Sequence, residues 1–286
     1  MSFPSSLVSV PFERPFSLAD TLKSGQLFHW EPLVIEGIEG VAGCIGNEKA
    51  YWIAQPDSET VLTLSGDEAP ISRYFGLDQS LGEIHGTFPR EDLVLDAAIQ
   101  YCPGIRVARQ PVWECLATFI TSSLKQVTHI RSISMALRQK YGEAHRLHGK
   151  TFHGYPSPGK LAEVGETELR TCALGYRAKS LALAGEALEK GEIDLEALEN
   201  SQDLDFSRSE LMRLHGVGEK IANCTLLFSC GKWAAFPIDV WIERILREHY
   251  RKRVKGAKLQ KWAETYFGEN AGYAQQYLFH YARKTM

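Results

Sequence analysis

The most informative part of this 286-residue chain is Leu214-His215-Gly216-Val217-Gly218-Glu219-Lys220-Ile221-Ala222, followed closely by Phe236-Pro237-Ile238-Asp239. Helix-like segments flank the Gly-x-Gly turn, which predicts a helix-hairpin-helix at about 207–230. Glycines leave backbone N–H groups unshielded at the start of the second helix, where the helix dipole favours an anion. We therefore expect His215, Gly216, Val217 and Gly218 to clamp a phosphate through their N–H groups. The alternative is a simple connection between two helices.

Two side chains next to this turn could carry chemistry. Lys220 lies in the first turn of the second helix, where the helix dipole and partial burial favour a neutral, nucleophilic amine. A nearby carboxylate would oppose this effect, and a surface lysine that only contacts phosphate is the plain alternative. Asp239 follows Pro237 at the start of an apolar-periodic helix, so it fits an N-cap. One oxygen can cap while the other faces a cleft, and we expect both roles.

The composition predicts a soluble globular protein large enough for two domains, with 44% hydrophobic and 23% charged residues. The net charge of −3 does not by itself point to nucleic acid. Six scattered cysteines form no Cys-x-x-Cys pair, and His145, His148 and His153 match no common zinc spacing. We therefore expect no metal site. Free thiols and the absence of a signal or membrane segment predict a cytoplasmic protein, nucleoid-associated in a bacterium.

The pattern of apolar and polar residues changes near residue 90. Residues 1–90 contain short β-like segments such as Tyr51-Trp52-Ile53-Ala54, bounded by turn residues. Residues 91–286 consist mainly of helix-length amphipathic segments, with a Gly- and His-containing connection at 142–156. The predicted class is α+β, with a β-rich N-terminal domain followed by a mostly helical region of two lobes.

An ordered set of motifs across nearly the whole chain resembles the helix-hairpin-helix DNA glycosylases, and more narrowly the 8-oxoguanine DNA glycosylases. The resemblance implies a base-excision repair enzyme that flips 8-oxoguanine and related oxidised purines out of double-stranded DNA. It implies cleavage of the N-glycosidic bond by a lysine nucleophile, strand nicking by β-elimination, a monomer and no membrane partner. Besides the hairpin, the motifs are Ser24-Gly25-Gln26-Leu27-Phe28-His29-Trp30, Arg73-Tyr74-Phe75, Phe119-Ile120-Thr121-Ser122-Ser123, Leu174-Gly175-Tyr176-Arg177-Ala178 and Gly272-Tyr273-Ala274-Gln275.

The same resemblance assigns roles in catalysis and in holding the opened duplex. Lys220 would be the nucleophile, and Asp239 the carboxylate that stabilises positive charge at C1′. Extrusion of a base leaves a gap in the stack that must be filled. Tyr176 matches the wedge of the family, and Arg177 and His129 would contact the estranged base.

The base pocket is also implied by the resemblance. Cys224 and Phe279 would contact the two faces of the flipped purine. Gln275, which shares a helix face with Phe279, would bind the Watson–Crick edge. Gly25 would present its carbonyl oxygen to N7–H, a proton that 8-oxoguanine carries and guanine lacks. A C-terminal helix that only packs its tyrosines against the core is the structural alternative.

The chain departs from the animal and plant enzymes at three places. Leu124-Lys125-Gln126 replaces an asparagine run, His129 replaces an arginine near the opposite cytosine, and Trp241 replaces a phosphate-contacting histidine. These departures favour a shorter, bacterial-type member with a weaker preference for cytosine opposite the lesion. The resemblance requires no cofactor, although a hairpin of this kind can bind a monovalent cation through carbonyl oxygens.

Two rival functions fit parts of the pattern. A monofunctional alkylpurine DNA glycosylase keeps the aspartate but lacks the lysine. The presence of Lys220 therefore argues against this function. A non-catalytic helix-hairpin-helix DNA-binding protein would use the hairpin only as a clamp, which leaves the pairing of Lys220 with Asp239 unexplained.

Overall fold

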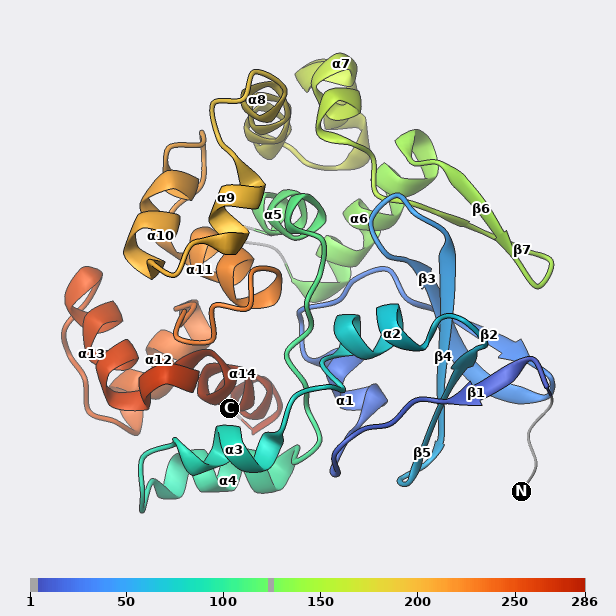
Figure 1. Ribbon diagram of the computed structural model, residues 1–286. Coiled ribbons are helices and arrows are strands. Elements are labelled where there is room, and N and C mark those ends of the chain that lie inside the picture. The colour runs from blue at the N-terminus through green and yellow to red at the C-terminus, as the bar shows by residue number, and fades with distance from the viewer. Residues whose placement is uncertain (1–4, 123–125, 286) are drawn as a thin grey trace.

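The computed structural model describes residues 5–122 and 126–285 (Figure 1). Its N-terminal part contains a five-stranded antiparallel sheet in the order β1-β5-β4-β3-β2. The strands of this sheet are β1 (Leu7–Ser9), β2 (Glu31–Ile35), β3 (Ile38–Cys44), β4 (Ala50–Asp57) and β5 (Thr60–Leu64).

Buried side chains lie on both faces of this sheet, and the alternation along β4 shows why. Tyr51 and Ile53 point to one face, where they join a cluster that includes Tyr74. Trp52, between them, points to the other face and joins a cluster that includes Phe152. Period-2 alternation of side chains produces this division. The sheet is therefore held between the helices that follow it and a later hairpin.

Helices make up most of the remaining described residues. The first group consists of α1 (Leu18–Lys23), α2 (Glu68–Phe75), α3 (Leu81–Gly86), α4 (Leu93–Tyr101), α5 (Val112–Thr121), α6 (Val127–Tyr141) and α7 (Pro158–Leu169). The second group consists of α8 (Arg177–Glu189), α9 (Leu195–Asn200), α10 (Leu204–Met212), α11 (Glu219–Phe228), α12 (Val240–Glu248), α13 (Ala257–Phe267) and α14 (Ala271–Thr285). Short 3-10 turns cover Arg170–Cys172 and Gly268–Asn270. The predicted α+β class is confirmed.

Polar residues begin many of these helices by binding their first free N–H groups. Ser157 caps α7 by accepting from the N–H of Lys160, with Pro158 in the first turn as the sequence predicts. Asp92 caps α4, and Asp203 caps α10. Capping of this kind stabilises a helix by about 1 kcal/mol and fixes where it starts.

The connection expected at 142–156 has regular structure, which corrects the prediction. It forms a two-stranded antiparallel hairpin, β6 (Ala144–Leu147) and β7 (Lys150–His153). His148 and Gly149 make the turn with positive φ values of 43° and 79°. Two consecutive residues with positive φ suit a tight hairpin turn. The sequence predicts only a connection here because its short strands lack a clear alternation of apolar and polar residues.

The helices of the central and C-terminal regions meet around α5 and α14. Helix α5 packs against α11 and α8, while α14 packs against α4 and α12 (Figure 1). One large cluster of buried apolar side chains runs through these helices. Because α5 begins at residue 112 and α14 is the last helix, segments far apart in sequence converge on one region.

Candidate active site

The predicted hairpin lies between α10 and α11, and close packing explains one of its glycines. Gly216 has a φ of 79°, a conformation that favours glycine. A Cβ atom at this position would lie 2.3 Å from the Oγ atom of Ser180. The same Oγ is 3.1 Å from Nδ1 of His215. The turn is therefore seated against α8, and larger residues at 216 would push it away.

The backbone N–H groups of the turn do not all match the predicted clamp. The N–H of Val217 donates to the carbonyl of Leu214 at 3.1 Å, and its side chain is buried. Val217 thus closes the turn instead of offering a free donor, which corrects the expectation for this residue. Gly218 is exposed, and a Cβ there would meet no atom within 4 Å among the described residues. The open approach to the start of α11 is at Gly218.

Lys220 lies in the first turn of α11, and its amine is held in place. Its Nζ donates to Oγ of Ser122 at 3.1 Å and lies 5.1 Å from the centre of the Phe119 ring. The hydroxyl of Ser122 in turn donates to the carbonyl of Phe119 at 2.7 Å. The serine proton is therefore engaged, and its oxygen is left to accept from the lysine. The amine is oriented by a helix that is remote in sequence.

Asp239 is the N-cap of α12, as the sequence predicts. Its Oδ1 accepts from the N–H groups of Trp241 at 3.1 Å and Ile242 at 2.9 Å. Burial raises the pKa of this carboxyl above 3.8, while the two N–H groups and Lys220 oppose the rise. A carboxylate in such a place can stabilise nearby positive charge strongly, because little water screens it.

Lys220 and Asp239 interact through space, with the amine bound to Ser122 instead of the carboxylate. Cys224, one turn further along α11, is also close to the amine. Burial raises the pKa of its thiol to about 11, and Lys220 partly opposes this rise. The thiol is therefore protonated near neutral pH and does not compete with the lysine as a nucleophile.

The predicted base-binding residues of the first and last segments meet. Gly25 has a φ of 83°, and a Cβ there would lie 2.9 Å from Cε1 of Phe279. Only glycine satisfies both conditions. Gln275 is buried one turn before Phe279 on α14, and its Oε1 has no hydrogen-bond partner among the described residues. An unpaired buried amide oxygen is costly and marks a place where a ligand can bind.

Buried hydrogen bonds hold the Gly25 loop. Gln276 on α14 donates to the carbonyl of Ser24 at 3.1 Å. Gln26 donates to the carbonyl of Arg106 at 2.7 Å and accepts from the N–H of Ala108 at 2.7 Å. The residues on both sides of Gly25 are thus tied to distant segments, which holds the loop that carries the Gly25 carbonyl.

The residues predicted to hold the opened duplex lie at the surface or next to it. Tyr176 is 59% exposed, which suits a side chain that must insert into DNA. Arg177 is buried, with its guanidinium carbon 4.3 Å from the centre of the Tyr176 ring. His129 is exposed in the first turn of α6. Ser123, Leu124 and Lys125, which also entered the sequence comparison, lie outside the described residues.

Two residues near this site had no role in the sequence reading. Ser122 belonged to a quoted motif, but its contact with Lys220 depends on the packing of α5 against α11. Arg283 lies one turn beyond Phe279, with its guanidinium carbon 5.2 Å from the centre of that ring. The helical spacing of Gln275, Phe279 and Arg283 was the signal that could have indicated it.

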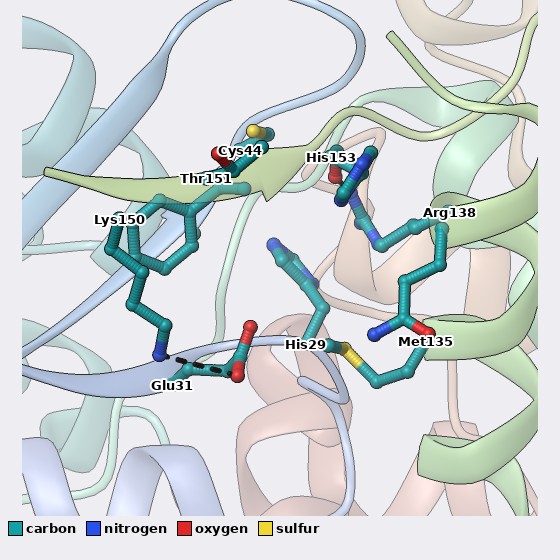
Figure 2. Close-up of a pocket in the computed structure, with 11 residues that line it drawn as sticks. His29, Glu31, Cys44, Met135, Arg138, Lys150, Thr151 and His153 are labelled. Atoms are coloured by element: carbon teal, nitrogen blue, oxygen red, sulfur yellow. Dashed lines mark hydrogen bonds and ion pairs between the residues drawn. The ribbon is translucent and has the colours of Figure 1, made fainter. Parts of the chain in front are cut away.

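A cavity of about 220 Å³ lies elsewhere, between the sheet, α6 and the β6–β7 hairpin (Figure 2). Figure 2 shows His29 pointing into it, with Lys150 paired to Glu31 on one side and Arg138 on the other. None of the predicted site residues lines this cavity. In the described part of the chain, no three or more His, Cys, Asp and Glu side chains gather as metal ligands.

Comparisons with known proteins identify relatives of this chain. Residues 9–116 match the family model for the N-terminal domain of 8-oxoguanine DNA glycosylase. The chain is 32% identical over 217 residues to a probable N-glycosylase/DNA lyase of Methanothermobacter thermautotrophicus, covering 68% of this chain and 69% of the relative. It is 28% identical over 299 residues to the N-glycosylase/DNA lyase OGG1 of Arabidopsis thaliana, covering 97% and 79%.

A solved structure extends the likeness to the whole fold. The 8-oxoguanine glycosylase/lyase of Clostridium acetobutylicum, in complex with double-stranded DNA containing cytosine opposite 8-oxoguanine, superimposes with a TM-score of 0.89. The two proteins are 30% identical, with 98% of this chain and 96% of that chain covered. No described helix of this chain is both long and apolar enough to span a membrane. The chain shares its fold with these relatives and carries a lysine in the hairpin and an aspartate that follows it. It therefore belongs to the 8-oxoguanine DNA glycosylase/lyase family.

Proposed function

We propose that this protein is a bifunctional DNA glycosylase and abasic-site lyase that removes 8-oxoguanine from double-stranded DNA. The observation that carries the proposal is the Lys220 amine, held by Ser122 beside the carboxylate of Asp239. Family membership supports the same activity, since the curated relatives are named N-glycosylase/DNA lyases.

The chemistry follows from these two side chains. Lys220 attacks C1′ of the flipped nucleotide, and the bond from C1′ to the base breaks, so that the base leaves with the bonding electrons. Asp239 stabilises the positive charge that develops at C1′. Ring opening then produces an imine between Lys220 and the sugar. The imine makes the C2′ proton acidic, and its loss expels the 3′-phosphate by β-elimination.

Recognition of the oxidised base is proposed for the pocket on α14. The carbonyl of Gly25 accepts the N7–H of 8-oxoguanine, whereas guanine presents a lone pair there and repels it. Phe279 and Cys224 contact the two faces of the base, and the free Oε1 of Gln275 accepts from its Watson–Crick edge. A ligand that leaves such donors and acceptors unpaired loses more binding free energy than one that only fills an apolar site less well. Hydrogen bonds therefore discriminate more strongly between similar ligands.

The proposed reaction requires no cofactor, because Lys220 supplies the nucleophile and Asp239 the charge. A monovalent cation at the hairpin would bind carbonyl oxygens and support the phosphate clamp. We also propose that the protein acts as a monomer and in the compartment that holds chromosomal DNA, the cytoplasm if the source is a bacterium. An alkylpurine glycosylase or a non-catalytic DNA-binding protein would have no use for the lysine held by Ser122.

Replacement of Lys220 tests the covalent step. Lys220→Gln should still bind lesion-containing duplex, because the hairpin N–H groups remain, but should form no adduct that borohydride traps. Lys190→Gln, at an exposed position, is the matched control and should trap like the wild type. Full trapping by Lys220→Gln would disprove the assignment of the nucleophile.

Removal of the Ser122 hydroxyl tests how the amine is oriented. Ser122→Ala should slow borohydride trapping by roughly tenfold, since one hydrogen bond to a charged or reacting group is worth about 1.5 kcal/mol. Ser132→Ala removes an exposed hydroxyl on α6 and should change nothing. Equal trapping rates for Ser122→Ala and the wild type, with both proteins folded, would show that the contact has no catalytic role.

Replacement of Asp239 separates its charge from its capping role. Asp239→Asn keeps an N-cap side chain but should slow base excision at least about a hundredfold. Because burial raises the pKa of Asp239, folding favours its protonated form. The ionised carboxylate therefore lowers the stability of the folded protein at any pH above the raised pKa. The variant should therefore melt at the same or a higher temperature at pH 7, and this difference should close below pH 3.8. Strong destabilisation, with activity tracking the folded fraction, would make the residue structural.

We expect the enzyme to have only a weak preference for cytosine opposite the lesion. Arg177 is stacked on Tyr176, and His129 is shorter than the arginine it replaces and lacks the planar fork of a guanidinium. The loss of one good contact removes about 1–3 kcal/mol of discrimination. Single-turnover excision of 8-oxoguanine paired with each of the four bases measures this preference. A cytosine preference of several hundredfold would mean that other residues restore the missing contact.

A further inference from the structure

Arg283 extends the row of base-binding residues along α14. Its guanidinium carbon is 5.2 Å from the centre of the Phe279 ring, and its Nη1 donates to the carbonyl of Lys23 at 3.4 Å. The side chain is half-buried. Arg283 lies outside the motifs that carry the family resemblance. Its position is nevertheless determined by contacts with two other segments.

The guanidinium also lies beside Gly25. A Cβ at Gly25 would be 3.1 Å from Nη1 of Arg283 and 2.9 Å from Cε1 of Phe279. The backbone of Gly25, the ring edge and the guanidinium therefore meet at one place. Five N–H donors of a guanidinium allow Arg283 to keep its bond to Lys23 and still donate to a ligand.

The order of residues on α14 places Arg283 at one end of a bound purine. Residues four apart on a helix are separated by about 6 Å along its axis. Gln275 faces the Watson–Crick edge of the base, and Phe279 contacts its ring face. Arg283 comes next and lies toward the opposite end of the purine. Because Gly25 faces N7, the neighbouring atom on that side is the oxygen at C8.

We propose that Arg283 is a base-binding residue that donates a hydrogen bond to the C8 oxygen of the flipped base. The proposal rests on the proposed function, because it takes 8-oxoguanine in this pocket as given. Gly25 and Arg283 would then recognise two adjacent features of the same lesion, the N7–H donor and the C8 oxygen acceptor. Guanine has neither feature, since it carries a hydrogen at C8.

This contact would also assist the departure of the base. When the bond between C1′ and N9 breaks, its electron pair moves to N9 and is shared with the C8 oxygen through C8. A guanidinium at that oxygen stabilises the developing negative charge more strongly than the neutral ground state. Arg283 also interacts electrostatically with Asp239, which offers a competing explanation of any effect on rate.

The test compares Arg283→Leu with the wild type on three duplexes, containing 8-oxoguanine, 8-thioguanine or a preformed abasic site. 8-Thioguanine keeps N7–H but replaces the C8 oxygen by sulfur, a weak acceptor. Arg283→Leu should excise 8-oxoguanine about tenfold more slowly, as expected for one charge-assisted hydrogen bond. Its preference for the oxygen over the sulfur compound should shrink. Strand cleavage at the abasic site, where no base is present, should be unchanged.

Lys284→Leu is the matched control, because Lys284 is the exposed neighbour of Arg283 and should behave as the wild type. If strand cleavage at the abasic site slows as much as excision of 8-oxoguanine, Arg283 acts through Asp239 or the fold. That result would overturn the proposal. An unchanged preference for oxygen over sulfur, or faster excision by the variant, would also overturn it. A wild-type protein that excises no 8-oxoguanine would instead refute the proposed function itself.

Discussion

The buried ion pair between Glu114 and Arg138 joins the parts of the molecule on which the active site is built. Both side chains are only 2% exposed. Glu114, in the first turn of α5, also accepts from the N–H of Gly46, in the connection between β3 and β4, at 2.9 Å. Arg138 on α6 donates to the carbonyl of His153 in the hairpin at 3.2 Å. Burial raises the pKa of Glu114, and Arg138 opposes that rise. Because an unpaired buried charge is strongly destabilising, sheet, hairpin and helices must keep this one arrangement.

Helix α5 connects that ion pair, at its N-terminal end, to Ser122 and Lys220 at its C-terminal end. Its C-terminal turn carries Phe119, whose ring stacks on Phe228 of α11 with a centre-to-centre distance of 5.5 Å. The same turn ends at Ser122, which holds the amine of Lys220. Interiors this closely packed transmit small displacements, so the position of the Lys220 amine depends on how α5 packs against the sheet. The β-rich region thus helps to position this amine even though Lys220 is in the helical region.

The proposed base-binding site depends on a second contact, between the first and last parts of the chain. The loop around Gly25 is tied to α14 by Gln276 and packs against Phe279. The N–H of Val107 donates to the hydroxyl of Tyr273 on the same helix at 3.2 Å. The Oε1 of Gln275, which has no partner among the described residues, is therefore carried by a helix that these contacts hold in place. Such preorganisation reduces the entropy that binding a flipped base would otherwise cost.

Local physics explains what the sequence by itself determined. The α+β class, the turn at Gly216, the capping role of Asp239 and the place of Lys220 follow from turn chemistry, helix caps and periodicity, which act over a few residues. Only the tertiary structure decided which distant groups meet these residues. The bond from Lys220 to Ser122 and the position of Arg283 beside Gly25 join segments about 100 and 260 positions apart, and no local pattern encodes such pairs. The commitment of the Val217 N–H to its own turn was likewise undecided, because the sequence permits either partner and the packed conformation selects one.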